Sequence, residues 1–124
     1  MTKKEFALAQ IAPYFKNPKT CAVDELTGKC MYLAKDGKMC IAGKNLIDPK
    51  KWNFSSSISV LIGTYGEEIF KPEARGILSR EEWSNLQILH DAIAFNLRNR
   101  DVRDLCKSQL FTYDEMVEAA DKLS

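Results

Sequence analysis

The chain has 124 residues, 45% of them hydrophobic and 28% charged, a usage typical of one compact globular domain. Its 18 basic and 17 acidic side chains give a net charge of +1, which excludes a strong overall field that would attract nucleic acid or an anionic membrane. No apolar run approaches the length of a membrane span, and the first residues lack a signal-peptide pattern. We therefore expect a cytosolic protein with a single domain over residues 1–124.

The N-terminal part of the chain predicts one helix followed by a β-hairpin. Thr2 and Glu5 form the pattern of a capping box, and the helix is expected to stop near Pro18. A polar stretch then leads to two short apolar segments, residues 30–33 and 39–42, which have the character of paired strands. A two-stranded hairpin is marginal in water by itself, so helices must cover it.

The turn of this hairpin allows two registers. A two-residue loop at Asp36 and Gly37 places Cys30 and Cys40 on opposite faces of the ribbon. A three-residue loop that begins at Lys35, with Gly37 in the left-handed position, places the two cysteines on one face as diagonal neighbours. Only the second register permits the two thiols to share a metal ion, and the sequence does not choose between them.

The middle of the chain is richer in turns. Residues 44–52 indicate a short helical turn or a loop, and the serine-rich residues 53–57 indicate an exposed bend. The apolar, β-branched residues 57–65 fit a strand or a short buried helix, and we favour the helix. Residues 67–78 contain a proline and a glycine and are expected to form a connecting loop.

Two further capping boxes begin helices in the C-terminal half, at Ser79 with Glu82 and at Thr112 with Glu115. The first precedes a strongly amphipathic helix, whose apolar side chains recur at steps of three and four. This buried stripe consists of Trp83, Leu86, Leu89, His90, Ile93 and Leu97. Together these elements predict an α+β fold in which a β-hairpin, a small antiparallel sheet, packs on about four helices.

The cysteines and the only histidine are the candidates for a metal site. The four cysteines lack the closely spaced pairs of structural zinc sites, so we favour buried thiols and expect no cofactor. If a metal binds, its ligands are Cys30, Cys40 and His90. Asp91 follows His90 by one residue, about 100° around the helix, and is therefore not expected to orient it as in a catalytic triad.

No catalytic motif is present, so an enzyme is not favoured. Arg98, Arg100 and Arg103 cluster and are candidates for binding a small phosphorylated ligand. Asp101 and Asp104 interrupt this basic run, as expected of a solvated helix surface, and argue against nucleic-acid binding.

Several short segments of the two halves form a combined pattern, namely Cys30-x-Tyr32, Asp36-Gly37, Cys40-Ile41-Ala42-Gly43, Leu46-Ile47-Asp48 and Leu86-Gln87-x-x-His90-Asp91. In this pattern the chain resembles a family of small tailed-phage and prophage proteins, whose members carry a C-x-Y…D-G…C-x-x-G…L-I hairpin and an L-Q-x-x-H-D helix. The resemblance implies no established activity, but it favours a cysteine-containing hairpin that docks on the helix around His90.

A phage origin would place the protein in the host cytoplasm, where small accessory phage proteins commonly bind and inhibit a host or anti-phage defence protein. The leading expectation is therefore a binding protein that acts by protein–protein contact. Its contact surface is expected at the bend of residues 52–57 and the loop around Pro72, with Trp52 and Phe54 as aromatic anchors. The sequence leaves the oligomeric state open.

Overall fold

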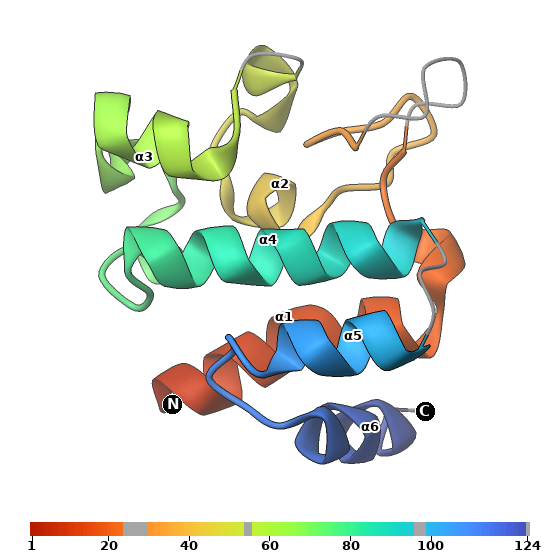
Figure 1. Ribbon diagram of the computed structural model, residues 1–124. Helices are drawn as coiled ribbons and strands as arrows, with labels where there is room; N and C mark the ends of the chain where they lie inside the picture. The colour runs from red at the N-terminus through yellow and green to blue at the C-terminus, as the bar shows by residue number, and fades with distance from the viewer. Residues whose placement is uncertain (24–29, 54–55, 96–98, 124) are drawn as a thin grey trace.

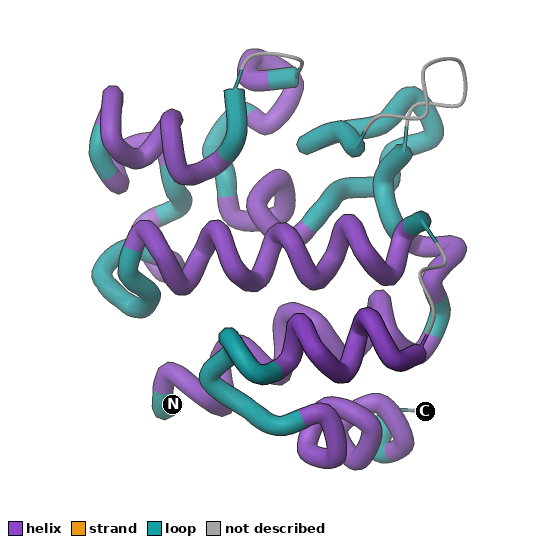
Figure 2. Tube along the Cα trace, viewed as in Figure 1, coloured by secondary structure: helices purple, strands orange, loops and turns teal. Residues whose placement is uncertain are grey.

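The computed structural model describes residues 1–23, 30–53, 56–95 and 99–123. Within these ranges the regular structure is helical, and Figure 2 shows no strand. The α-helices are α1 (Lys3–Lys16), α2 (Ile41–Asn45), α3 (Ile58–Tyr65), α4 (Arg80–Ala94), α5 (Asn99–Cys106) and α6 (Tyr113–Asp121). Short 3-10 helices complete the connections and comprise η1 (Pro18–Thr20), η2 (Pro49–Trp52), η3 (Glu67–Ile69) and η4 (Pro72–Ala74).

Helix α4 separates two layers of the molecule. In Figure 1 it crosses the centre, with α1, α5 and α6 below it and with α2, α3 and the segment of residues 30–53 above it. Helix α1 packs against both α4 and α6, whereas α2 and α3 pack against the opposite side of α4. We call the two sides the lower helical layer and the upper layer. Because both layers pack on α4, this helix has to present apolar side chains in more than one direction.

All three capping boxes predicted from the sequence are confirmed. Thr2, Ser79 and Thr112 each accept a hydrogen bond from the backbone N–H three residues later, and the glutamate at that position accepts one from the cap backbone. Each box therefore satisfies two of the backbone donors that a helix start leaves without partners. The start positions of α1, α4 and α6 follow from these local contacts.

The core is built around the predicted stripe of α4. Trp83, Leu86, Leu89, His90 and Ile93 are all buried, and the predicted sixth member, Leu97, lies outside the described residues. The stripe meets large apolar side chains from other parts of the chain. These include Ile11 and Tyr14 of α1, Ile58 and Leu61 of α3, Phe70, and Met116 of α6. Burial of this apolar surface is the main source of stability for the fold.

The predicted α+β fold is wrong, because the described residues form an all-α structure without a sheet. Of the expected pairing, only an isolated bridge between Leu33 and Met39 is present, and Cys30 instead forms an isolated bridge with Val23. The second expected strand, residues 39–42, ends at Cys40, which caps the start of α2. Residues 39 and 40 of this expected strand therefore precede the helix, and residues 41 and 42 belong to its first turn.

A single asparagine explains why residues 32–33 need no partner strand. The Asn53 side chain accepts hydrogen bonds from the backbone N–H groups of Tyr32 and Leu33, at 2.9 and 3.1 Å, and donates one to the Leu33 carbonyl at 2.8 Å. The Leu33 N–H and carbonyl are the pair of groups that a neighbouring antiparallel strand would otherwise satisfy. The side-chain amide thus takes the place of a strand at this point.

The turn itself follows the three-residue alternative. The Leu33–Met39 bridge, and the hydrogen bond from the Ala34 N–H to the Lys38 carbonyl at 2.8 Å, both correspond to a loop of residues 35–37. Gly37 has a φ of 90°, in the left-handed region that glycine adopts without strain. The ladder does not extend to Cys30 and Cys40, but both residues line the same pocket.

Two other expectations concern helices. Residues 57–65 form a helix, as favoured, with Ser57 as the cap of α3. The region expected to be a loop, residues 67–78, contains η3 and η4 and joins the upper layer to α4. No helix among the described residues combines the length and the apolar character needed to cross a membrane.

Candidate metal centre

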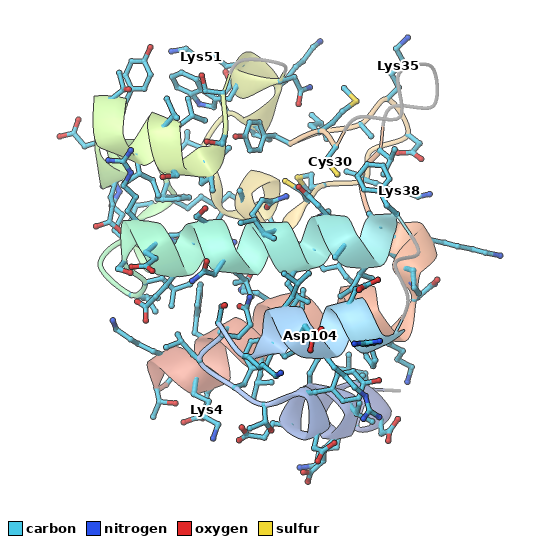
Figure 3. All side chains as sticks on the ribbon, viewed as in Figure 1. Lys4, Cys30, Lys35, Lys38, Lys51 and Asp104 are labelled. Atoms are coloured by element: carbon cyan, nitrogen blue, oxygen red, sulfur yellow. The ribbon has the colours of Figure 1, made fainter. Side chains whose placement is uncertain are left out.

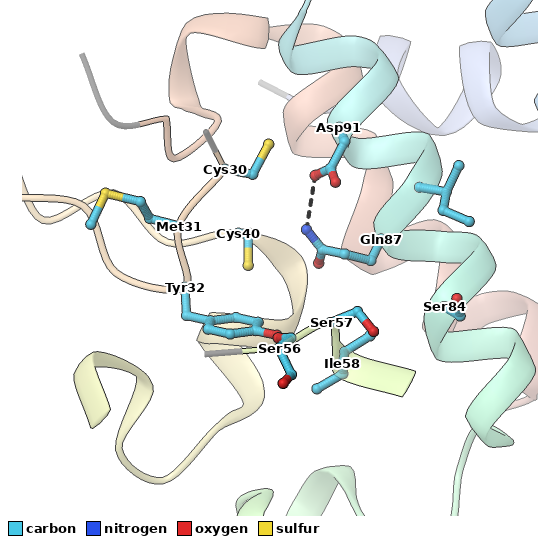
Figure 4. A pocket seen from close by; sticks show the side chains of 11 residues that line it. Cys30, Met31, Tyr32, Cys40, Ser56, Ser57, Ile58, Ser84, Gln87 and Asp91 are labelled. Carbon is cyan, nitrogen blue, oxygen red and sulfur yellow. Dashed lines mark hydrogen bonds between the residues drawn. The ribbon is translucent and has the colours of Figure 1, made fainter. Parts of the chain in front are cut away.

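One face of α4 carries the polar side chains of the candidate site. Ser84, Gln87, Ile88 and Asp91 follow one another at steps of three and four, so they share one side of the helix. This side faces the upper layer, where all four residues line a pocket. Figure 4 shows Gln87 and Asp91 pointing from α4 toward the segment that carries Cys30 and Cys40. The site therefore forms between two segments that are far apart in sequence.

Gly43 allows the upper segment to pack closely enough to form this site. A Cβ atom at this position would lie 1.9 Å from the Tyr32 carbonyl oxygen, well inside any permitted contact. Helix α2 can therefore approach the backbone of Tyr32 only because residue 43 has no side chain. The approach places Cys40, the cap of α2, beside the extended residues that follow Cys30.

Three chemically different side chains converge at the end of the pocket nearest to the C-terminus of α4. The Cys30 sulfur, a carboxylate oxygen of Asp91 and a ring nitrogen of His90 all lie within 4.8 Å of one another. His90 is fully buried, whereas Cys30 and Asp91 are partly exposed at the pocket. Cys40 lines the same pocket but is not a member of this group. Two of the three expected ligands, Cys30 and His90, are thus together, and Asp91 takes the third place.

His90 and Asp91 contact each other directly, with 3.0 Å between Nδ1 and Oδ1. The expectation that Asp91 would not orient His90 is therefore wrong. A turn of 100° separates the two side chains on the helix, but adjacent residues are close enough for both side chains to lean toward each other. A carboxylate is an acceptor only, so this contact places the imidazole proton on Nδ1.

The second ring nitrogen of His90 is left without a partner. Nε2 is buried and makes no hydrogen bond to any described residue. The ring is held in place from one side by Tyr14, whose ring meets it edge-on with 4.6 Å between centroids. Because Nδ1 is the ring nitrogen beside the Asp91 carboxylate, a metal ion shared by the two residues would bind His90 through Nδ1, in place of the proton.

Gln87 fixes the position of the Asp91 carboxylate. Its Oε1 accepts a hydrogen bond from the Ala42 N–H at 3.2 Å, and its Nε2 donates to Asp91 Oδ1 at 3.0 Å, as the dashed line in Figure 4 marks. The first bond defines which end of the amide is the donor. Gln87 therefore bridges α2 and the Asp91 carboxylate. In metal sites, residues that hydrogen-bond to a ligand fix its orientation in this way.

The surroundings make both thiols hard to ionise. Burial, together with the nearby Asp91 carboxylate, raises the pKa of Cys30 far above its usual value. Burial likewise raises the pKa of Cys40 to about 12. Both are therefore neutral thiols in the free protein and poor nucleophiles. The same negative environment that opposes a thiolate favours a cation, which compensates the charge and converts the thiol to a ligand.

The pocket above these residues has a volume of about 350 Å³. Residues from three parts of the chain line it, and they include Met31, Tyr32, Ser56, Ser57, Ile58, Ser84 and Ile88. Figure 3 shows Cys30 on the side of the upper layer that faces α4, whereas the labelled side chains of Lys35 and Lys51 lie at the outer edge. None of the described residues that line the pocket is a lysine or an arginine.

The expected aromatic anchors give a mixed result. Trp52 is half-buried and packs against Tyr65, with 4.9 Å between ring centroids and Lys51 over its ring. Phe54 lies outside the described residues. Tyr65 is 53% exposed, so the Trp52–Tyr65 pair does present aromatic surface to solvent.

The expected arginine cluster is far from the pocket. Arg100 and Arg103 are exposed on α5, in the lower helical layer, and Arg98 lies outside the described residues. The Arg103 guanidinium lies over the Tyr113 ring at 4.5 Å and so already makes a cation–π contact within the protein. Binding of a phosphorylated ligand at these arginines stays a prediction.

Sequence reasoning missed Asp91 and Gln87 as parts of the site. Their spacing with Ser84 and Ile88 indicated a second face of α4, distinct from the buried stripe, and a polar face so close to the only histidine was a usable signal. The sequence does not show which segment packs against this face of α4, because the contact between Gln87 and Ala42 depends on the tertiary packing.

Comparison with known proteins identifies no relative. No protein-family model matches the chain, and no curated protein and no solved structure is similar to it. The resemblance to small phage proteins therefore stays a prediction. Six residues of the segments that carry this resemblance belong to the candidate site or line its pocket, namely Cys30, Tyr32, Cys40, Gln87, His90 and Asp91.

Proposed function

We propose that the protein is a small zinc-binding module, with Cys30, His90 and Asp91 as the metal ligands. The observation that carries this proposal is the convergence of one sulfur, one imidazole nitrogen and one carboxylate oxygen within 4.8 Å. A set of sulfur and nitrogen donors with one carboxylate suits zinc better than magnesium or calcium, which prefer oxygen ligands alone.

Two features of the surroundings support the same function. Gln87 donates a hydrogen bond to the Asp91 carboxylate and fixes its orientation, and metal ligands in proteins commonly have such a hydrogen-bond partner. A cation also neutralises the unfavourable charge of a thiolate next to Asp91.

The experiment is a zinc titration of the purified full-length chain, read by native mass spectrometry and by competition with a chromophoric chelator. We expect one zinc ion per chain. Cys30→Ala should weaken zinc binding by more than the 10–100-fold that is typical for loss of a supporting residue. Circular dichroism of each variant checks that the fold is retained.

A matched control is available in Cys106→Ala. Cys106 is also a thiol, is buried in α5, and lies in the lower helical layer. This variant should bind zinc as the wild type does. A wild-type chain that binds no zinc, or a Cys30→Ala variant that binds it unchanged, would contradict the proposal.

The phage-encoded inhibitor of a host or defence protein stays a prediction. One observation favours a contact surface near the expected place, because the exposed ring of Tyr65 extends the aromatic surface of Trp52. Trp52→Ala should abolish partner binding without loss of the fold, and unchanged affinity for the partner would rule this surface out.

A further inference from the structure

We infer that the metal held by Cys30, His90 and Asp91 keeps one coordination position open toward the adjoining pocket, and that this pocket admits a small uncharged molecule with a nitrogen or oxygen donor atom. This inference rests on the proposed zinc site and adds the class of ligand. It would make the protein a receptor or catalyst for such molecules, in contrast to a structural zinc site that is closed by four protein ligands.

The open position follows from the number of protein ligands. Three side chains form the group of donor atoms, and zinc in proteins is usually four-coordinate. Cys40 is the other thiol at the pocket, but its sulfur accepts a hydrogen bond from the Gly43 N–H at 3.3 Å as the cap of α2. Moving it to a metal would remove this cap. The fourth position is therefore left to water or to a ligand from the pocket.

The charge of the ligand follows from the groups present. A zinc ion with one thiolate and one carboxylate is neutral, so the centre itself offers little attraction to an anion. No lysine or arginine occurs among the described residues that line the pocket. Phosphates and carboxylates would therefore enter without a compensating charge, whereas an uncharged ligand would not carry that cost.

The size and polarity of the ligand follow from the walls. A volume of about 350 Å³ is at the lower end of the range for small-molecule sites. Met31, Ile58 and Ile88 supply apolar surface, and Ser56 and Ser84 lie among them with polar groups. The Tyr32 ring is held by a hydrogen bond from its hydroxyl to the Ser56 carbonyl, so this wall is fixed before a ligand arrives. A small molecule that has both apolar surface and a polar donor atom suits this space.

The experiment uses the full-length chain loaded with Co²⁺ in place of zinc, because cobalt reports its ligands through visible absorption. Cobalt bound by Cys30 should show a sulfur-to-metal charge-transfer band. Imidazole, added at a pH where it is neutral, should shift the visible bands and saturate. Acetate, the anionic probe, should give no saturable shift over the same range.

Two tryptophan variants test whether the probe enters through the pocket. Ile88 is 50% exposed at the pocket, and Ile88→Trp should fill it and abolish the saturable shift while the charge-transfer band remains. Val60 is 47% exposed on α3 and does not line the pocket, so Val60→Trp should respond to imidazole as the wild type does. Equal responses of the two variants would overturn the assignment of the pocket.

The outcomes separate this inference from the proposed function. Failure of the wild type to show any sulfur-to-cobalt band would overturn the zinc site itself. A normal band with no response to imidazole would leave the zinc site standing and overturn the open position. Loss of charge-transfer intensity in Cys40→Ala would identify Cys40 as a fourth ligand and would equally overturn the inference.

Discussion

The two layers of the molecule are held together in different ways. In the lower helical layer, α1 and α6 each begin at a capping box, as α4 does, and the layer packs on α4 through large apolar side chains. In the upper layer, the segment of residues 30–53 has short elements and depends on single side chains, above all Asn53 and Gln87, to satisfy its backbone. The proposed metal centre lies where the upper layer meets α4.

The difference indicates where substitutions should affect stability and where they should affect the site. Loss of an apolar side chain in the helical core removes buried area and leaves a cavity. Loss of a polar contact in the upper layer leaves a backbone group or a ligand without its partner. The first change should lower the free energy of unfolding, and the second should mainly lower the affinity for metal.

Trp83→Ala should have the largest effect on stability. Trp83 is 1% exposed, stacks on Phe70 at 4.7 Å and meets Phe6 edge-on at 5.9 Å. Truncating a buried aromatic side chain typically costs about 3–5 kcal/mol of unfolding free energy, and chemical denaturation measures it. Val60→Ala, at an exposed position, should change stability by no more than about 0.5 kcal/mol. Similar losses in the two variants would contradict the packing described here.

Gly43→Ala should damage the upper layer and the metal centre together. The added Cβ collides with the Tyr32 carbonyl, so α2 has to move away from residues 30–33, at a typical cost of about 1–3 kcal/mol. Zinc binding should be lost with it, as a zinc titration would show. Gly37→Ala is the control, because its strain comes from a positive φ and nothing lies within 4 Å of the new Cβ. That variant should retain zinc, and equal zinc binding by both would refute the role of Gly43.

Gln87→Leu should weaken zinc binding by about 10–100-fold, as is typical when a residue that supports a ligand is lost. The Asp91 carboxylate would lose the donor at 3.0 Å that holds it, while the three ligands remain. The dissociation constant, measured by chelator competition, is the readout. Gln109→Leu in the lower helical layer removes a comparable half-buried glutamine and should leave zinc binding unchanged. A Gln87→Leu variant with wild-type affinity would count against a supporting role.

The smallest expected effect is the pH dependence of the α4 capping box. The Ser79 N–H donates to the Glu82 carboxylate, and with the Lys3 ammonium it lowers the Glu82 pKa in the folded state. A lowered folded pKa gives stability that is present above the ordinary value of 4.5 and is lost as the pH falls through the folded value.

Thermal unfolding of the wild type and of Glu82→Gln at several pH values checks this prediction. The difference in melting temperature between them should be largest at neutral pH and should shrink in acid. Glu73→Gln, an exposed position outside any capping box, controls for the general loss of a negative charge. A difference for Glu82→Gln that stays constant from neutral to acid pH would show that the carboxylate does not act through its ionisation.

Sequence patterns predicted the helical part of this fold well. The starts of α1, α4 and α6, the buried stripe of α4 and the helix at residues 57–65 were all expected, because capping and apolar periodicity act over a few neighbouring residues. The hairpin was not predicted correctly. Its apolar segments were too short to distinguish a strand from an extended pair followed by a helical turn, and the decisive partner, Asn53, is about 20 residues away.

By itself, the sequence determined three helix starts, one buried helix face, a glycine turn and a short list of residues able to bind a metal. Only the tertiary structure decided that residues 32 and 33 bond to an asparagine side chain, that Cys40 caps a helix, and that Asp91 lies beside Cys30 and His90. The physical reason is the range of the interactions. Capping and periodicity are local, whereas the site depends on contacts between α4 and a segment about 50 residues earlier, which form only when the apolar core brings the two together.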